Sequence, residues 1–129
     1  MSGRIVHFEI PFDDGERARG FYREAFGWNL TAIPGMNYTG VTTGPTSEQG
    51  MPAEPGFING GMFDRSDAAP KGPVITVDVA SIDAALEKIE QHGGAKLVGR
   101  TEIPQMGFYA YFTDTEGNVM GLWENLPRG

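Results

Sequence analysis

The chain has 129 residues and no cysteine. This absence excludes disulfides, thiolate metal ligands and a cysteine nucleophile. No apolar run approaches the roughly 20 residues that a membrane helix needs. The N-terminal string MSGRIVHF also lacks the basic and then apolar segments that are typical of a secretion signal. We therefore predict a cytoplasmic protein with no membrane partner.

Basic residues are scarce as well. The chain has 10 Lys and Arg against 17 Asp and Glu, which gives a net charge of −7. Nonspecific nucleic-acid binding relies on a basic surface that displaces counterions, so this charge balance argues against a nucleic-acid partner. The length is that of one ordinary domain with its own core. A small-molecule ligand is the partner that we expect.

A strand–helix pattern opens the chain. Alternating apolar residues over 4–10 predict a half-buried strand that Pro11 ends, with Val6, Phe8 and Ile10 on one face and His7 and Glu9 on the other. An apolar stripe at helical spacing follows, and we expect Asp13 or Asp14 to cap this helix and Gly27 to end it.

The same pattern returns 67 positions later. A strand begins at Val74, Ser81 caps the next helix, and Gly93-Gly94 ends it. Seven residues separate His7 from Asp14 and Val74 from Ser81. This repeat predicts two related modules.

The remaining segments complete each module with short strands. We expect them at 28–33, 37–43 and 57–63 in the first module, and at 95–100, 107–114 and 118–124 in the second. The polar stretch 44–56 is expected to be a loop. The sequence thus predicts an α+β fold, a single domain over 1–129 built of two βαβββ modules, with module one at 1–63, a linker at 64–73 and module two at 74–129.

Three strings carry a family resemblance: VHFEIP, RARGFYREAFGW and YFTDTEGNVMGLWE. They resemble the vicinal oxygen chelate superfamily, the glyoxalase, bleomycin-resistance and extradiol-dioxygenase group. The resemblance implies two βαβββ modules that form a curved mixed sheet around a small-molecule cavity. It also implies a lyase or isomerase similar to lactoylglutathione lyase, or a binding protein, and it favours a homodimer.

The resemblance further implies four metal-ligand positions, on the first and fourth strands of each module. His7 occupies the first of them. Val74, Gly61 and Gly121 stand at the other three, and none of them offers a donor side chain. We therefore predict no cofactor. A divalent metal at a displaced site, completed by Glu9 or Asp78, stays an alternative.

His7 and Glu9 are the candidate catalytic residues, with His7 as proton acceptor. The alternative is that His7 is only a polar residue on a half-solvated strand face. The candidate ligand-binding residues lie on strand faces turned away from the predicted helices: Asn59, Gly61, Thr76, Asp78, Tyr111, Gly121 and Trp123. Their alternatives are solvent exposure for the polar residues, and a close backbone or a bulge for the glycines.

Three functions remain open at this point. The first is a glyoxalase-like small-molecule-binding protein or a metal-independent lyase or isomerase. The second is a non-catalytic protein that sequesters a ligand, as bleomycin-resistance proteins do. The third is a lyase or dioxygenase that depends on a divalent metal at a displaced site. The ligand itself cannot be read from the sequence.

Overall fold

The computed structural model describes residues 3–65 and 70–127. The chain divides into two compact units. We call His7–Pro73 the first unit, and Met1–Val6 together with Val74–Gly129 the second unit. Of the predicted linker 64–73, residues 66–69 lie outside the described residues.

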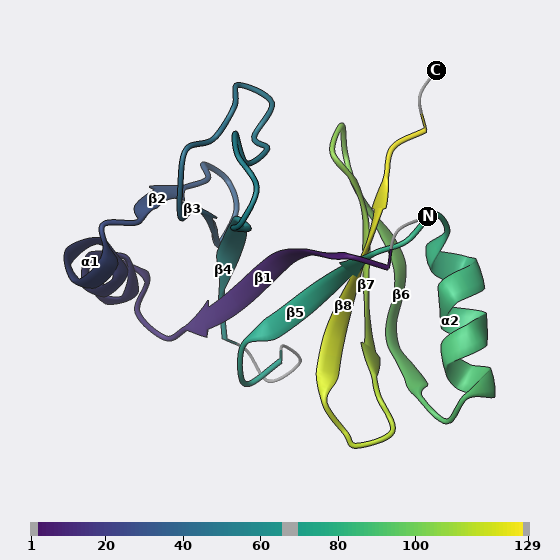
Figure 1. The fold of residues 1–129 in the computed structure, drawn as a ribbon. Coiled ribbons are helices and arrows are strands. Elements are labelled where there is room, and N and C mark those ends of the chain that lie inside the picture. Colours follow the sequence, from purple (N-terminus) through teal and green to yellow (C-terminus); the bar gives the residue numbers. More distant parts are fainter. Residues whose placement is uncertain (1–2, 66–69, 128–129) are drawn as a thin grey trace. The chain divides into compact units, whose positions relative to one another are not determined.

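Each half of the chain has the order βαβββ (Figure 1). This confirms the predicted α+β class and the duplicated modules. No helix in the described ranges is long and apolar enough to cross a membrane. The elements are β1 (Ile5–Phe12), α1 (Gly15–Phe26), β2 (Asn29–Ala32), β3 (Tyr38–Thr42), β4 (Gly60–Asp64), β5 (Val74–Asp78), α2 (Ile82–Gln91), β6 (Ala95–Ile103), β7 (Gly107–Thr113) and β8 (Val119–Asn125).

The first unit has the strand order β2-β3-β4-β1, in which β4 runs antiparallel to β3 and parallel to β1. Its core joins strands and helix through the buried Leu30, Val41 and Met62, against which Phe8 and Tyr22 pack. Side chains alternate along a strand. His7 and Glu9 of β1 therefore lie on the sheet face that this core does not use.

The second unit has the order β5-β8-β7-β6. The residues before β1 belong to it, because the Gly3 amide donates to the Asp78 carbonyl at 2.9 Å and the Asp78 amide donates to the Arg4 carbonyl at 2.8 Å. Helix α2 packs on this sheet, with a core of Ile82, Leu86, Ala110 and Leu122 (Figure 1). The residues of β5, β7 and β8 that alternate with the core residues lie on the opposite face of this sheet.

Two local expectations fail in the first unit. Pro11 does not end the strand, since β1 continues to Phe12. The Phe12 carbonyl accepts from the Arg65 amide, so the backbone groups of Pro11 point away from β4 and the missing N–H breaks no bond to that strand. The strand expected at 57–63 begins only at Gly60, because Asn59 is bonded to a loop, as described below.

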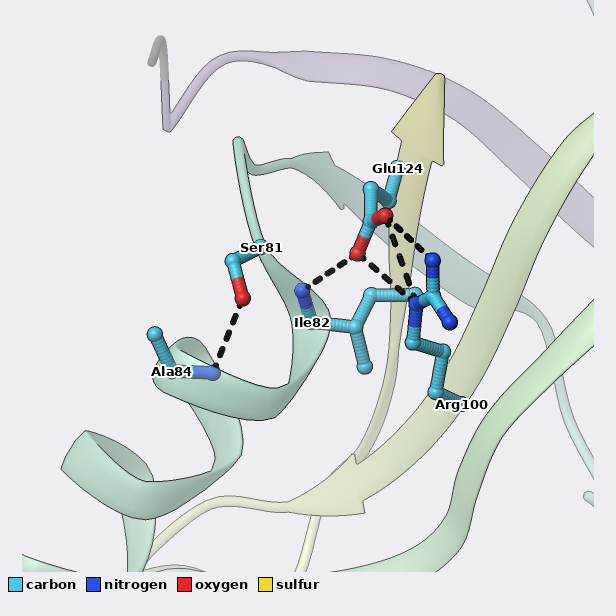
Figure 2. Close-up of polar contacts among 5 residues, drawn as sticks. All are labelled: Ser81, Ile82, Ala84, Arg100 and Glu124. Atoms are coloured by element: carbon cyan, nitrogen blue, oxygen red, sulfur yellow. Dashed lines mark hydrogen bonds and ion pairs between the residues drawn. The ribbon is translucent and has the colours of Figure 1, made fainter. Parts of the chain in front are cut away.

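A carboxylate of the last strand holds the start of α2 (Figure 2). Glu124 of β8 accepts from the Ile82 amide at 2.8 Å, and Arg100 of β6 donates to both of its oxygens at 2.9–3.3 Å. The Arg100 guanidinium lies 3.6 Å from the centre of the Phe108 ring. Ser81 caps the same helix start, as predicted, by accepting from the Ala84 amide.

Arg100 also sets the charge state of this carboxylate. Its hydrogen bonds, aided by the Ile82 amide, hold the pKa of Glu124 below its ordinary value of 4.5, although burial opposes this shift. A carboxylate with a lowered pKa stabilises the fold above the unfolded-state pKa. That stability is lost as the pH falls through the folded-state pKa.

Replacing the carboxylate should therefore matter at neutral pH. We expect Glu124→Gln to lower the free energy of unfolding at pH 7 by about 1.5–3 kcal/mol, the range for a hydrogen bond to a charged group. The difference should shrink as the pH is lowered below 4.5. Urea unfolding at pH 7 and at a pH below 4.5 measures this difference in the free energy of unfolding. Glu87→Gln, on the exposed face of α2, is the control. An equal deficit at both pH values would contradict the role of the charge.

Candidate functional site

Three side chains of the first unit form a hydrogen-bonded chain on the face opposite its core. His7 and Glu9 come from β1, and Tyr38 opens β3. The Tyr38 hydroxyl lies 3.0 Å from His7 Nε2 and donates to Glu9 Oε2, also at 3.0 Å. The structure thus joins the two predicted catalytic residues through a tyrosine that the sequence pattern did not single out.

Gly61 gives Tyr38 the room to reach its partners. In the strand register Tyr38 lies opposite Phe63, whereas Gly40 lies opposite Gly61 and Gly61 lies beside Glu9. A side chain at Gly61 would overlap the Tyr38 hydroxyl, since a Cβ placed there would meet the phenol oxygen and ring carbons. The phenol therefore lies across the backbone of Gly61.

Burial sets the charge state of His7. Desolvation lowers the pKa of the imidazole below its ordinary value of 6.5, and the negative charge of Glu9 opposes that shift without reversing it. The ring is therefore neutral at pH 7. A neutral imidazole has one nitrogen that donates and one that accepts, so it can take up a proton.

The four positions that the family resemblance assigns to a metal do not offer a metal-binding set. Val74 is buried, and the Gly61 position is filled by the Tyr38 phenol. At Gly121 a Cβ would lie 2.7 Å from Thr76 Oγ1, so a threonine hydroxyl fills that space. Within residues 3–65 and 70–127, no three His, Asp or Glu side chains are grouped so as to hold an ion. The donor set does not fit the superfamily's metal centre.

The second unit brings together five of the predicted ligand-binding residues. Register places them in two rows across β7, β8 and β5, on the face opposite α2. The first row is Tyr111, Gly121 and Thr76, and the second row is Tyr109, Trp123 and Asp78. Tyr109 and Tyr111 meet edge to face, with ring centroids 5.7 Å apart. We call these six residues the aromatic face.

Asn59 lies apart from the predicted groups. Its Oδ1 accepts from the Thr43 amide at 2.9 Å, and its Nδ2 donates to Thr46 Oγ1 at 3.0 Å. These bonds tie the end of the connection between β3 and β4 to its start. In the structure, Asn59 thus anchors the segment before β4.

One signal in the sequence does point to Tyr38. The string NYTGVTT places Tyr38 and Gly40 on the same strand face, and FINGGMF places Gly61 on a neighbouring strand. A glycine on the neighbouring strand leaves space for an aromatic residue to lie across it. The register that aligns Gly40 with Gly61 is not contained in the periodicity, so only the structure identifies the pair.

Comparisons with known proteins agree with this architecture. A family model described as "Bleomycin resistance protein-like N-terminal" matches residues 4–44. A "Glyoxylase-like domain-containing protein" of Didymella fabae is 32% identical over 126 residues, which are 95% of this chain and 94% of that protein. The "Putative glyoxylase CFP32" of Mycobacterium bovis is 25% identical over 120 residues; the match covers 90% of this chain and 43% of that protein.

Solved structures share the fold at low identity. Methylmalonyl-CoA epimerase from Mycobacterium tuberculosis has a TM-score of 0.67 and 15% identity, over 98% of this chain and 90% of that one. A variant of the Streptomyces coelicolor methylmalonyl-CoA epimerase, solved with 2-nitronate-propionyl-CoA, has a TM-score of 0.64 and 19% identity, over 98% of this chain and 100% of that one. The identity with the Didymella protein extends over nearly all of both chains, and the chain therefore belongs to the vicinal oxygen chelate superfamily, among its glyoxalase-like proteins.

Proposed function

We propose that this glyoxalase-like protein binds a small carbonyl compound and, without a metal, moves a proton at the carbon next to the carbonyl group. The observation that carries the proposal is the chain His7–Tyr38–Glu9, in which a neutral imidazole is hydrogen-bonded to a phenol that donates to a carboxylate. A lyase or an isomerase would both begin with such a step.

The chemistry needs only groups of the first unit. His7 takes the proton as the C–H bond breaks, and the electron pair moves onto the carbonyl oxygen to give an enolate. Return of the proton to the same or a neighbouring carbon completes an isomerisation. Glu9 favours the step, because its negative charge stabilises the imidazolium that forms. The Tyr38 phenol connects these two groups at 3.0 Å on either side.

The aromatic face of the second unit suits a flat apolar group. Gly121 adds no side chain of its own between Tyr111 and Thr76, whose hydroxyl covers the glycine, and Trp123 lies in the adjacent row. Aromatic rings offer a large apolar area with little loss of conformational entropy. We propose Thr76, Asp78, Tyr111, Gly121 and Trp123 as the binding residues of this unit.

Deuterium uptake tests the proposed proton transfer even when the product is unidentified. Carbonyl metabolites that raise the melting temperature would be incubated with the protein in D2O and followed by proton NMR. We expect exchange at the carbon beside the carbonyl, and a loss of about 100-fold or more in His7→Gln, which keeps a donor near Nε2 but removes the base. His92→Gln, at an exposed helix end, is the matched control. Exchange that survives in His7→Gln would remove His7 from the mechanism.

The pH profile provides a second test. The acidic limb of kcat/KM reports the base of the free protein, so its midpoint should lie below 6.5. Glu9 raises the pKa of His7, and Glu9→Gln should therefore shift the midpoint to still lower pH. A midpoint above 6.5, or a shift upward in Glu9→Gln, would contradict the proposed electrostatics.

Two other functions give distinct results. The match to a bleomycin-resistance-like model favours a protein that sequesters its ligand; such a protein would bind the same compounds with no exchange in any of them.

A metal-dependent enzyme would instead retain an ion through purification. We expect elemental analysis to give far less than one equivalent of zinc, nickel, iron or manganese per chain. We also expect a chelator to leave the melting temperature and the exchange rate unchanged. One equivalent of metal, with activity lost on chelation, would replace the proposed mechanism by a metal-dependent one.

A further inference from the structure

We infer that Tyr38 is a positioning residue that fixes the His7 ring with its proton on Nε2, which makes Nδ1 the atom that accepts the proton. The role of Nδ1 as proton acceptor rests on the proposed function. The tautomer itself follows from the hydrogen bonds of the first unit alone.

The tautomer follows from the number of protons available for the hydrogen bonds that join His7, Tyr38 and Glu9. A tyrosine hydroxyl has one proton to donate, and a carboxylate can only accept. The Tyr38 hydroxyl donates its proton to Glu9 Oε2. The bond between the same oxygen and His7 Nε2, at 3.0 Å, then needs its proton from the ring. A neutral ring that donates through Nε2 has its lone pair on Nδ1.

Gly61 makes this arrangement possible. The phenol can reach both partners only because Gly61 has no side chain, and the residue opposite Gly61 on β3 is also a glycine. Tyr109 is the matched residue of the second unit, since it lies opposite Trp123 as Tyr38 lies opposite Phe63. The residue opposite Gly121, however, is Tyr111. The second unit therefore presents Tyr111 at the place where the first unit has Gly40.

The second histidine of the chain, His92, is an internal reference for measuring the tautomer of His7. The chain has only two histidines. His92 Nδ1 lies 2.9 Å from the Lys88 carbonyl, which can only accept, so the His92 ring must donate through Nδ1. The two rings of the protein are thus expected to be opposite tautomers, and nitrogen NMR of labelled protein distinguishes them directly.

The experiment records the ring-nitrogen and ring N–H proton signals of the full chain at pH 7.5. We expect His7 to show a protonated Nε2 with a visible N–H proton and an unprotonated Nδ1, and His92 to show the reverse pattern. Tyr38→Phe should abolish the visible His7 N–H proton, because the ring then loses its acceptor. Gly61→Ala should do the same while keeping the phenol, because its methyl group displaces Tyr38. Tyr109→Phe should leave the His7 signals unchanged.

Two results would overturn the inference. One is a His7 ring protonated on Nδ1 in the unmodified chain. The other is an unchanged His7 N–H signal in Tyr38→Phe, which would show that the phenol does not hold the ring. If either variant fails to fold, the signals of the unmodified chain still decide the tautomer.

The outcome also separates this inference from the proposed function. A correct tautomer without deuterium exchange in any compound would reject the proton transfer and leave Tyr38 as the residue that orients His7. If exchange depends on His7 but the ring is protonated on Nδ1, the proposed function holds and the role given to Tyr38 is wrong. If the tautomer and the proton transfer are both correct, Tyr38→Phe should slow deuterium exchange in any compound that shows it. Tyr109→Phe should keep the protonation pattern of His7.

Discussion

The arrangement of the first unit depends on one close approach, that of the Tyr38 phenol to the backbone of Gly61. The phenol oxygen lies where a side chain of residue 61 would begin, and from there it bonds to His7 and Glu9. Buried polar groups need hydrogen-bond partners, because an unmet donor or acceptor costs about 1–3 kcal/mol. Displacement of Tyr38 would remove one hydrogen bond from the imidazole and one from the carboxylate at the same time.

The two modules use the same glycine position in different ways. Gly61 and Gly121 occupy matching places on the fourth strands, and a side chain at either would collide with a hydroxyl. In the first unit the hydroxyl belongs to a tyrosine of β3, whose ring spans the strand. In the second unit it belongs to Thr76 of the adjacent β5, which lies directly beside Gly121. The internal duplication thus preserved the backbone while the polar chemistry stayed with the module that contains His7.

The sequence predicted the features that depend on local spacing. Asp14 and Ser81 each cap a helix through the amide three residues later, and this geometry involves only neighbours in the chain. The core faces of β1 from Phe8 onward and of β7 follow from alternation in the same way. Alternation fails at the start of β5, where Ile75 is exposed and Val74 is buried. The 67-residue repeat predicted the βαβββ order, and three strings of residues indicated the superfamily.

The features that depend on register could not be predicted in this way. Tyr38 reaches His7 only because β3 and β4 are aligned with Gly40 opposite Gly61, and periodicity does not specify that alignment. The hydrogen bonds of Asn59 depend on how the connection between β3 and β4 folds back on Thr43 and Thr46. The continuation of β1 past Pro11 depends on the side of the strand on which β4 lies. At the four metal positions, the lack of donor side chains at Gly61, Val74 and Gly121 can be read from the sequence, whereas the hydroxyls beside Gly61 and Gly121 are seen only in the structure.

The bond from Glu124 to the Ile82 amide spans 42 positions of the chain. A ribosome synthesises the second helix well before the last strand, so this helix emerges without the carboxylate that later completes its first turn. Strands β1 to β4 and helix α1, by contrast, are all available once residue 64 has been made. Vectorial synthesis therefore allows the His7 module to form early, whereas the partner module must wait for the final strand to leave the exit tunnel. A nascent chain arrested before Glu124 would be the natural species in which to observe that delay.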